Sequence, residues 1–493
     1  MRMAWLVGGI ASIAAGPSPA QPAKTAITAR IRDYIEQCHA VAVCNGAYIV
    51  ARDGKPVFRG AVGDAGDDAR SPLTPDHAFD IGSVSKQFTA MAVLTLAAEG
   101  KVSLAAPVVT YLPDLPYRDV TVEQLLNHTS GIPDMLDSYG AMLRGGKQSA
   151  PLTGREVVAM LAAKDLPLRA RPGSVFAYNN TAYMVAASLV EAVAREPFDA
   201  YLQRRFFGPL GMTHTRVRTP ANEASIGPRA WGFRPAADGT RRPNEQLPGF
   251  YVRGAGGIYS TVSDLLIWEN ALPTGRVVPI AWWRRATTPL LLPDGRTYPY
   301  GYGLKLKPAS NGARRYNHDG DWRGFKANLA SYPDSRVTIV QLTNNSEDDS
   351  ADVNEEALAQ LAIGGDAAPV KAPIGRDLYA RLDDPAAARR WFMAQRTAQP
   401  QGYDIREDEL NALGYRLLDK KQVDAAVTVF GLAANAFPTS ANAFDSLAEA
   451  QEAKGDIAGA RATMRRAVAI APGSKQVADH AARLQAMPLP DAK

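Results

Sequence analysis

Cysteine is scarce in this 493-residue chain, which contains only Cys38 and Cys44. Because the sequence also lacks a His-Glu-x-x-His pattern, it holds no recognisable metal site, and we expect neither a metal nor another cofactor. An oxidising compartment would permit one disulfide. If the segment between the two cysteines is extended, they lie too far apart to bridge, so a turn would be needed. The pairing stays open here, with two free thiols favoured.

Long apolar runs and basic runs are missing as well. Lys and Arg number 55 against 50 Asp and Glu and are scattered among the acids, so nothing indicates nucleic acid binding. The apolar run Ala4–Ala15 is too short to span a bilayer, and no later segment is long enough either. Preceded by Arg2 and followed by Gly16–Ala20, it is typical of a secretory signal, residues 1–20, cleaved after Ala20. We therefore expect an exported protein, periplasmic or secreted, without a transmembrane segment.

Signatures of several enzyme classes are absent too. The sequence has no Gly-x-Ser-x-Gly, which argues against an α/β-hydrolase. It has neither Gly-Lys-Ser/Thr nor Gly-x-Gly-x-x-Gly, which mark nucleotide-binding enzymes. What the chain does contain is apolar material for a sizeable core, 46% of its residues, over a length that predicts two or three domains.

One stretch, Phe79–Ala90, combines a nucleophile with a candidate base. The residues from Ser83 to about Glu99 predict a helix that ends at Gly100. Ser83 and Lys86 are three positions apart, so both side chains leave one face of that helix and the amine can reach the hydroxyl. At the first helical turn Ser83 would also lie among unpaired backbone N–H groups, which favour a developing anion.

The alternative is structural, with Ser83 only capping the helix and Lys86 solvated. Apolar residues follow Lys86 around almost the whole helix, which is typical of a buried helix. A lysine that enters a buried helix needs a reason. Ser-x-x-Lys occurs nowhere else in the chain, but a four-residue pattern with two free positions is weak evidence alone.

The order of elements predicts a mixed α/β (α+β) domain over residues 24–365. An amphipathic helix at 24–39 precedes a hairpin, Ala47–Val62, whose turn is Asp53-Gly54. From Tyr300 the hydrophobic period changes to two, which predicts short strands and then a helix at 350–363. This order favours an antiparallel sheet flanked by helices beside a helical lobe, with a site in the cleft between them. The expected middle helices are Val122–Asn127, Gly154–Ala163, Thr181–Glu196, Phe198–Phe207 and Thr261–Leu272, and the expected strands are Tyr302–Leu306, Arg314–His318, Phe325–Tyr332 and Val337–Thr343.

A second region, 401–488, follows a linker and helix at 366–400 in which Ala, Pro and Asp dominate. Pro438 and Pro472 lie at equivalent places of a repeat whose length and apolar pattern resemble tetratricopeptide helix pairs. We expect a small all-α tetratricopeptide-like domain that leans on a helix near Asp383–Gln399 or on the main domain, because two repeats rarely stand alone. The repeats would either cover apolar surface or bind a protein partner. The matched positions are Leu410, Leu413, Gly414, Ala426, Phe430 and Ala433 in one repeat and Phe444, Leu447, Ala448, Ala460, Met464 and Ala467 in the other.

Two further motifs each occur once. A Tyr-x-Asn motif at 178–180 precedes an expected helix, and a His-x-Gly motif at 318–320 closes an expected strand. Each alone has a structural explanation, because Asn180 can cap a helix, Tyr178 can be a core phenol and His318 a satisfied strand histidine. Their order after Ser-x-x-Lys favours function instead.

Together these motifs resemble the serine hydrolases of the class C β-lactamase and penicillin-binding-protein-like family, which includes D-alanyl-D-alanine carboxypeptidases and related esterases. The segment Leu125–Pro133, Leu-Leu-Asn-His-Thr-Ser-Gly-Ile-Pro, is also similar to a loop of that family. The resemblance covers roughly residues 30 to 363. It implies a β-lactamase/transpeptidase-like fold and a site built from the three motifs, namely Ser83, Lys86, Tyr178, Asn180, and His318 with Gly320 in place of Lys-Thr-Gly.

The chemistry explains why these residue types are needed. A serine hydroxyl is a poor nucleophile until a neighbour takes its proton, and lysine and tyrosine have reference pKa values of about 10, too high for a base at neutral pH. A lysine cation lowers the pKa of a nearby phenol while burial lowers that of the amine, so Lys86 and Tyr178 can share one proton. The base for acylation stays open, with Lys86 favoured as activator of Ser83 and Tyr178 as proton shuttle. The resemblance implies that Asn180 orients Lys86 or a substrate amide, and that the N–H groups of Ser83 and Asp321 form an oxyanion hole.

His318 departs from the family pattern. A lysine there places a fixed positive charge beside the carboxylate of a β-lactam or a terminal D-alanine, whereas histidine is mostly neutral at pH 7 and Asp319 adds a negative charge. Nothing in the sequence places Arg323 in the cleft to restore the charge. We therefore expect an exported serine hydrolase that acts through an acyl-enzyme on an ester or amide, esterase-like or D-amino-acid peptidase-like. A true β-lactamase or a D-Ala-D-Ala carboxypeptidase is the alternative.

A function of another class is a penicillin-binding or sensing protein that does not turn over its ligand and recruits a partner through its repeats. The base-equipped serine favours the enzyme, because a pure binder has no need of Lys86 and Tyr178. The substrate is then a small molecule or a peptide. The remaining histidines are expected to be structural, and they are His39, His77, His128, His214 and His480.

Overall fold

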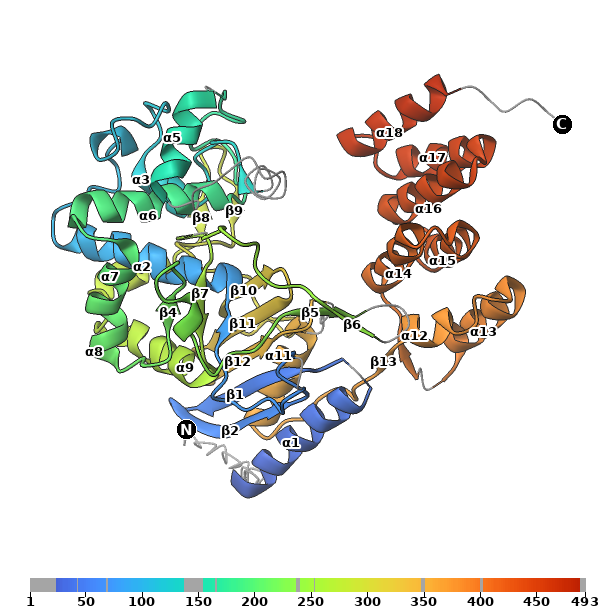
Figure 1. The fold of residues 1–493 in the computed structure, drawn as a ribbon, viewed down its shortest axis with the longest axis horizontal. Coiled ribbons are helices and arrows are strands. Elements are labelled where there is room, and N and C mark those ends of the chain that lie inside the picture. The colour runs from blue at the N-terminus through green and yellow to red at the C-terminus, as the bar shows by residue number, and fades with distance from the viewer. Residues whose placement is uncertain are drawn as a thin grey trace, which may run out of the picture.

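The computed structural model describes residues 24–41, 43–67, 70–136, 154–164, 166–235, 240–251, 253–346, 351–399 and 402–487 (Figure 1). The expected secretory signal, residues 1–20, lies outside these ranges and stays a prediction.

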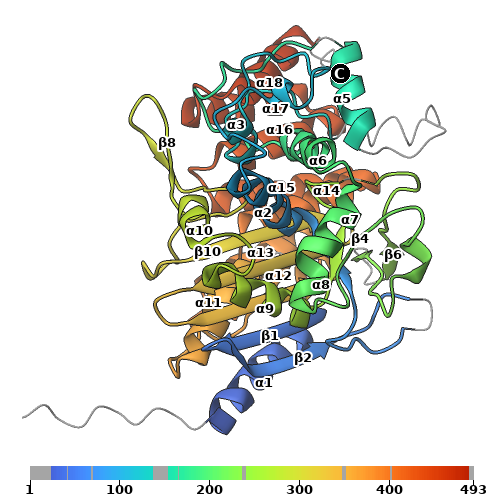
Figure 2. The same ribbon diagram turned by 90° about the vertical axis from the view of Figure 1, so that its left-hand side faces the viewer.

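A five-stranded antiparallel sheet forms the centre of the main domain (Figure 2). Its order is β10-β11-β12-β1-β2, so the N-terminal hairpin and the C-terminal meander meet where β1 pairs with β12. This arrangement confirms the predicted hairpin and antiparallel sheet. The strands are β1 (Gly46–Arg52), β2 (Lys55–Val62), β10 (Tyr316–Trp322), β11 (Phe325–Tyr332) and β12 (Val337–Thr343).

Helices cover both faces of this sheet, and the side chains of β1 alternate between them. Tyr48 and Val50 join the core under α1 (Lys24–Ala40) and α11 (Ala351–Ala362). Ala47, Ile49 and Ala51 point to the other face and join the larger core, which contains α9 (Val262–Ala271). Because both faces are covered, every residue of β12 is buried.

A helical lobe adjoins the β10 side of the sheet (Figure 1). Its central helix, α2 (Ser85–Ala98), is buried from Ser85 to Ala97 and packs against α6 (Asn180–Ala194). The fold is therefore the expected mixed α/β one. The remaining helices of this domain are α3 (Val122–Leu126), α5 (Gly154–Lys164), α7 (Phe198–Leu202), α8 (Gly208–Leu210) and α10 (Ile280–Ala286), and its short strands are β3 (Phe79–Asp80), β4 (Arg216–Val217), β5 (Phe233–Pro235), β6 (Arg241–Pro243), β7 (Ile258–Ser260), β8 (Leu290–Leu291) and β9 (Thr297–Tyr298).

The strand predicted at Tyr302–Leu306 is wrong. Gly303 has a φ of +71°, and its backbone lies so close to α2 that an added Cβ would stand 2.7 Å from the carbonyl oxygen of Lys86. This turn breaks the extended conformation. Only Lys305 pairs with the sheet, through two backbone hydrogen bonds of 2.7 and 3.0 Å with Asn317.

The strand predicted to close at His318 continues to Trp322. Trp322 pairs with Phe325, so the hairpin turn is Arg323-Gly324. Arg323 there has a φ of +56°, a conformation that the sequence pattern gives no reason to expect of arginine. His318 consequently lies within β10 rather than at its end.

The expectation of two free cysteines is also wrong, because Cys38 and Cys44 form a disulfide. The segment between them is not extended. The chain turns back at the end of α1, where the N–H groups of Val43 and Cys44 both donate to the carbonyl of Cys38 at 3.1 and 3.3 Å. This turn brings the two Cα atoms to 5.3 Å, within bridging range.

The C-terminal region is a series of helices that extends from the main domain (Figure 1). The predicted helix near Asp383–Gln399 is α13 (Pro385–Thr397), and its Phe392 shares a core with Leu410 and Phe430 of the first helix pair. The predicted support of the repeats by this helix is thus present. Their assignment as tetratricopeptide repeats stays a prediction. The other elements are β13 (Ala372–Pro373), α12 (Ile374–Tyr379), β14 (Tyr403–Asp404), α14 (Glu407–Asp419), α15 (Val423–Ala436), α16 (Ala441–Lys454), α17 (Ile457–Ile470) and α18 (Lys475–Ala486).

Two glycines of the first helix pair should respond oppositely to alanine. In α14 a Cβ at Gly414 would overlap the ring of Phe430, whereas Gly431 of α15 faces open space. We expect Gly414→Ala to destabilise the C-terminal region by about 1–2 kcal/mol through overpacking. The matched Gly431→Ala should stabilise it by up to about 1 kcal/mol through helix propensity.

Amide hydrogen exchange of α14 and α15 in the full chain measures both effects. Equal protection in the two variants would contradict the close contact between these helices.

Candidate active site

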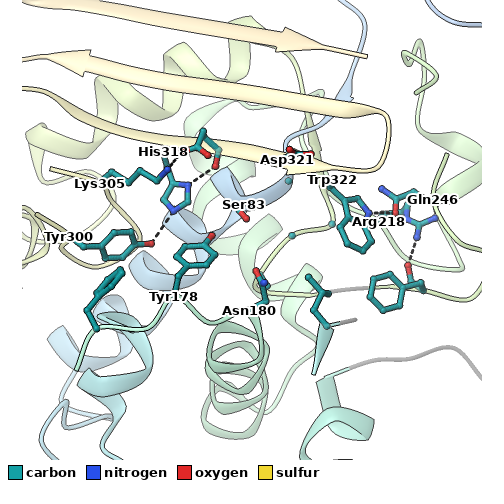
Figure 3. Close-up of a pocket in the computed structure, with 18 of the residues that line it drawn as sticks. Ser83, Tyr178, Asn180, Arg218, Gln246, Tyr300, Lys305, His318, Asp321 and Trp322 are labelled. Carbon is teal, nitrogen blue, oxygen red and sulfur yellow. Dashed lines mark hydrogen bonds and ion pairs between the residues drawn. The ribbon is translucent and has the colours of Figure 1, made fainter. Parts of the chain in front are cut away.

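Ser83 lies on a tight turn between β3 and α2. Gly82–Val84 form one 3₁₀ turn, and the α-helix begins only at Ser85, two residues later than predicted. Gly82 has a φ of +49°, and its N–H donates to the buried carboxyl of Asp80 at 2.8 Å. This turn presents Ser83 to a cavity of about 550 Å³ (Figure 3).

Lys86 is fully buried beneath Ser83. Its Nζ lies 2.9 Å from Ser83 Oγ, 2.9 Å from Asn180 Oδ1 and 3.0 Å from the carbonyl oxygen of Ala255. Burial lowers the pKa of Lys86 to about 7, because removal from water disfavours the ammonium more than the carboxylates of Asp134 and Asp319 favour it. A neutral amine can donate to Asn180 and Ala255 and direct its lone pair at Ser83.

Tyr178 faces the same hydroxyl. Its ring centre is 4.8 Å from Lys86 Nζ, and its side chain lines the cavity together with Ser83. Although 39% of the residue is exposed, the hydroxyl end is desolvated in the cleft, and this desolvation raises the pKa of Tyr178 above 10. The expected lowering of this pKa by a lysine cation is therefore wrong, because burial dominates and Lys86 itself tends to be neutral.

Asn180 is the first residue of α6 and joins Lys86 to a neighbouring loop. Its Oδ1 accepts from Lys86, while its backbone N–H and Nδ2 donate to Asp134 at 2.9 and 3.2 Å. The helix cap is the preceding residue, Asn179, whose side chain accepts from the N–H of Ala182 at 2.8 Å. The structural explanation for Asn180 as a cap therefore does not hold.

The backbone of β10 lies directly against the Ser83 turn. A Cβ at Gly320 would overlap the carbonyl oxygen of Ile81 and stand 3.1 Å from the N of Ser83. A Cβ at Gly82 would stand 3.0 Å from the N of Asp321. Only glycine at both positions permits this approach, which brings the N–H groups of Ser83 and Asp321 to the same part of the cleft.

His318 lies in the same cleft but is 1% exposed, and both its ring nitrogens are occupied. Nε2 lies 3.0 Å from the hydroxyl of Tyr300, and Nδ1 lies 2.6 Å from the carbonyl oxygen of Asp319. Burial lowers the pKa of His318 to about 4, so it is neutral at pH 7 as expected.

The family of the chain follows from comparison with known proteins. The Beta-lactamase family matches residues 31–363, which is most of the main domain. The chain belongs to the Beta-lactamase family. This match confirms the resemblance seen in the sequence motifs.

The chain is similar to a penicillin-binding protein and to a D-aminopeptidase, each at below 30% identity. The chain is 29% identical over 313 residues to penicillin-binding protein 4* of Bacillus subtilis, covering 62% of this chain and 69% of that protein. It is 26% identical over 325 residues to a D-aminopeptidase of Gluconobacter oxydans, covering 65% of this chain and 59% of that protein, so it spans about three fifths of that enzyme. The octameric penicillin-binding protein homologue from Pyrococcus abyssi shares the fold, with a TM-score of 0.60, 24% identity and coverage of 72% and 81%.

Sequence reasoning missed the charged wall of the cleft. Lys305 lines the cavity and is ion-paired with Asp319, and its backbone pairing with Asn317 holds it beside β10. Arg323 does not line the cavity, because its guanidinium donates to the carbonyl of Glu245 at 2.9 Å. The lysine could not be found from sequence, since its place depends on the irregular segment that replaces the predicted strand.

Metal-binding clusters and membrane-spanning helices are both absent from the described ranges of the chain. No cluster of three His, Cys, Asp or Glu side chains in those ranges could hold a metal ion. Among the helices described, none is long and apolar enough to cross a membrane.

Proposed function

We propose that this member of the Beta-lactamase family is a serine hydrolase that acts through an acyl-enzyme on an amide or ester. The observation that carries the proposal is the 2.9 Å contact between Lys86 Nζ and Ser83 Oγ at the floor of an open cleft. With a pKa of about 7, Lys86 can be a base at neutral pH, whereas Tyr178 keeps its proton.

The reaction begins when the Lys86 amine takes the Ser83 proton and Oγ attacks the substrate carbonyl carbon. The oxygen of that carbonyl becomes an anion, which the N–H groups of Ser83 and Asp321 can stabilise. The phenol of Tyr178 gives its proton to the departing oxygen or nitrogen and regains one from the Lys86 ammonium. Water then attacks the acyl-enzyme by the same route in reverse and releases the acid.

The charge of the cleft favours an esterase-like or D-amino-acid peptidase-like enzyme over a dedicated β-lactamase. His318 is neutral, and Lys305 is paired with Asp319, so the wall beside Tyr178 has little net charge to attract a substrate carboxylate. The similarity to a D-aminopeptidase agrees with this preference. A β-lactamase or D-Ala-D-Ala carboxypeptidase activity is the alternative.

We also propose that the chain is exported, as the pattern at residues 1–20 predicts. The Cys38–Cys44 disulfide supports export, because disulfides persist in oxidising compartments.

A serine-directed phosphonate tests the proposed function. We expect it to label Ser83, as peptide mass mapping would show. The Ser83→Ala variant should not be labelled. A chain that carries the label elsewhere, or none, would be a binding protein rather than a hydrolase.

The labelling rate should depend on pH through Lys86. Because the neutral amine is the base and its pKa is about 7, the rate should fall about tenfold per pH unit below pH 7 and level off above it. Lys86→Arg stays protonated across this range and should label at least about a hundredfold more slowly. A rate that does not change between pH 5 and pH 9 would exclude Lys86 as the base.

Substrates of different charge test the preference for substrates that carry no carboxylate. We expect a neutral chromogenic ester to be hydrolysed faster than a chromogenic cephalosporin, which carries a carboxylate. Lys305→Gln leaves Asp319 unpaired, so kcat/KM for an ester with an anionic leaving group should fall about threefold to fivefold further than for the neutral ester.

The control is Lys101→Gln, which removes a lysine from a surface pair with Glu99 and should leave both rates unchanged. Faster turnover of the cephalosporin by the unaltered protein would make a β-lactamase the better description.

A further inference from the structure

A chain of hydrogen bonds crosses the buried wall of the cleft from α6 to β10. The N–H of Asn179 lies 3.0 Å from His128 Nδ1, and His128 Nε2 lies 3.1 Å from the hydroxyl of Tyr300. That hydroxyl lies 3.0 Å from His318 Nε2, and His318 Nδ1 lies 2.6 Å from the carbonyl oxygen of Asp319. His128, Tyr300 and His318 are each at most 2% exposed.

The two ends of the chain fix the direction of every bond in it. The backbone N–H of Asn179 can only donate, so His128 Nδ1 accepts and its proton is on Nε2. The carbonyl of Asp319 can only accept, so His318 carries its proton on Nδ1 and its Nε2 is bare. Tyr300 therefore accepts from His128 and donates to His318, and the two histidines hold opposite tautomers.

Burial keeps both histidines neutral, as this arrangement requires. It lowers the pKa of His128 well below its usual range and that of His318 to about 4. Lys86 faces both imidazoles, and Lys305 and Asp319 also face His318. The neighbouring phenol of Tyr183 adds no donor, because its proton goes to the carbonyl of Leu126 at 2.6 Å.

We infer that His128 and Tyr300 are positioning residues, which hold the Tyr178 loop at a fixed distance from β10 through this directed chain. One end of the chain is the residue between Tyr178 and Asn180, and the other is two residues before Asp321. The chain thus ties the proposed proton donor to the proposed oxyanion site. His318 is a link of this hydrogen-bond chain. It stays neutral and does not bind the substrate as a cation. The inference rests on the proposed function only for its effect on rate.

Nitrogen NMR of the histidine rings tests the direction of the chain without any substrate. The protein has only six histidines, so the NMR signals of each ring can be assigned with single-histidine variants. At pH 7 we expect the Nε2–H form for His128 and the Nδ1–H form for His318, with neither ring titrating between pH 8 and pH 5. An Nε2–H or doubly protonated His318 at pH 7 would overturn the inference.

Two variants cut the chain at different links. Tyr300→Phe removes the donor to His318 Nε2, so the pKa of His318 should rise in an NMR titration. His128→Asn keeps an acceptor for Asn179 and tolerates the φ of +60° at this position, but no longer reaches Tyr300. Each should lower kcat for a reporter ester about tenfold to a hundredfold, with a smaller change in KM.

The double variant distinguishes one chain from two separate contacts. If the links act together, His128→Asn combined with Tyr300→Phe should be no more than about twofold slower than Tyr300→Phe alone. Multiplied losses, or single variants with kcat within about twofold of the parent, would overturn the positioning role.

The surface variant His77→Gln is the control and should keep both tautomers and the rate, since Nδ1 of His77 bonds within its own turn, to Thr74. Failure of the proposed function looks different, because Ser83 would then resist the phosphonate while the two tautomers remained as stated.

Discussion

The buried amine of Lys86 is the interaction on which the rest of the site depends. Its three hydrogen-bond partners, Ser83, Asn180 and the carbonyl of Ala255, come from three separate parts of the chain, and all three are neutral. A buried amine whose partners are all neutral favours its uncharged form, which can act as a base. This burial lowers the stability of the folded protein. The unfolded chain would bind a proton at this lysine up to a pKa of about 10.5, whereas the folded chain binds it only below about 7. The buried lysine therefore lowers the free energy of unfolding, and this loss becomes smaller as the pH rises from about 7 to about 10.5.

The cleft is assembled from elements that are distant in sequence. Ser83 and Lys86 begin α2, Asn180 begins α6, and Gly320 lies on β10 at the edge of the central sheet. The sheet itself closes only when the C-terminal meander pairs with the N-terminal hairpin through β1 and β12. Formation of the site therefore requires most of the main domain to be folded.

The local patterns were sufficient to predict much of this molecule. Strong periodicity predicted β11 and β12 with their observed bounds, and the three motifs identified the residues that meet at Ser83. The misses have a common cause, which is tertiary contact. Gly303 leaves the extended conformation because it packs on α2, and Cys38 meets Cys44 because α1 ends in a turn. Lys305 and Tyr300 enter the site through such contacts, and no local pattern marks them. His128 lies in the family-like segment at 125–133, but its contact with Tyr300 depends on the tertiary fold.

The close approach of Gly82 and Gly320 has a consequence for how this architecture can diversify. Where Gly82 meets Gly320, the floor of the cleft is backbone against backbone, so this part has no side chains whose exchange could reshape it gradually. The walls differ, since Phe250, Tyr298 and Trp322 are ordinary side chains that line the same cavity. New substrate preferences can arise by mutation of these walls while the floor is inherited unchanged.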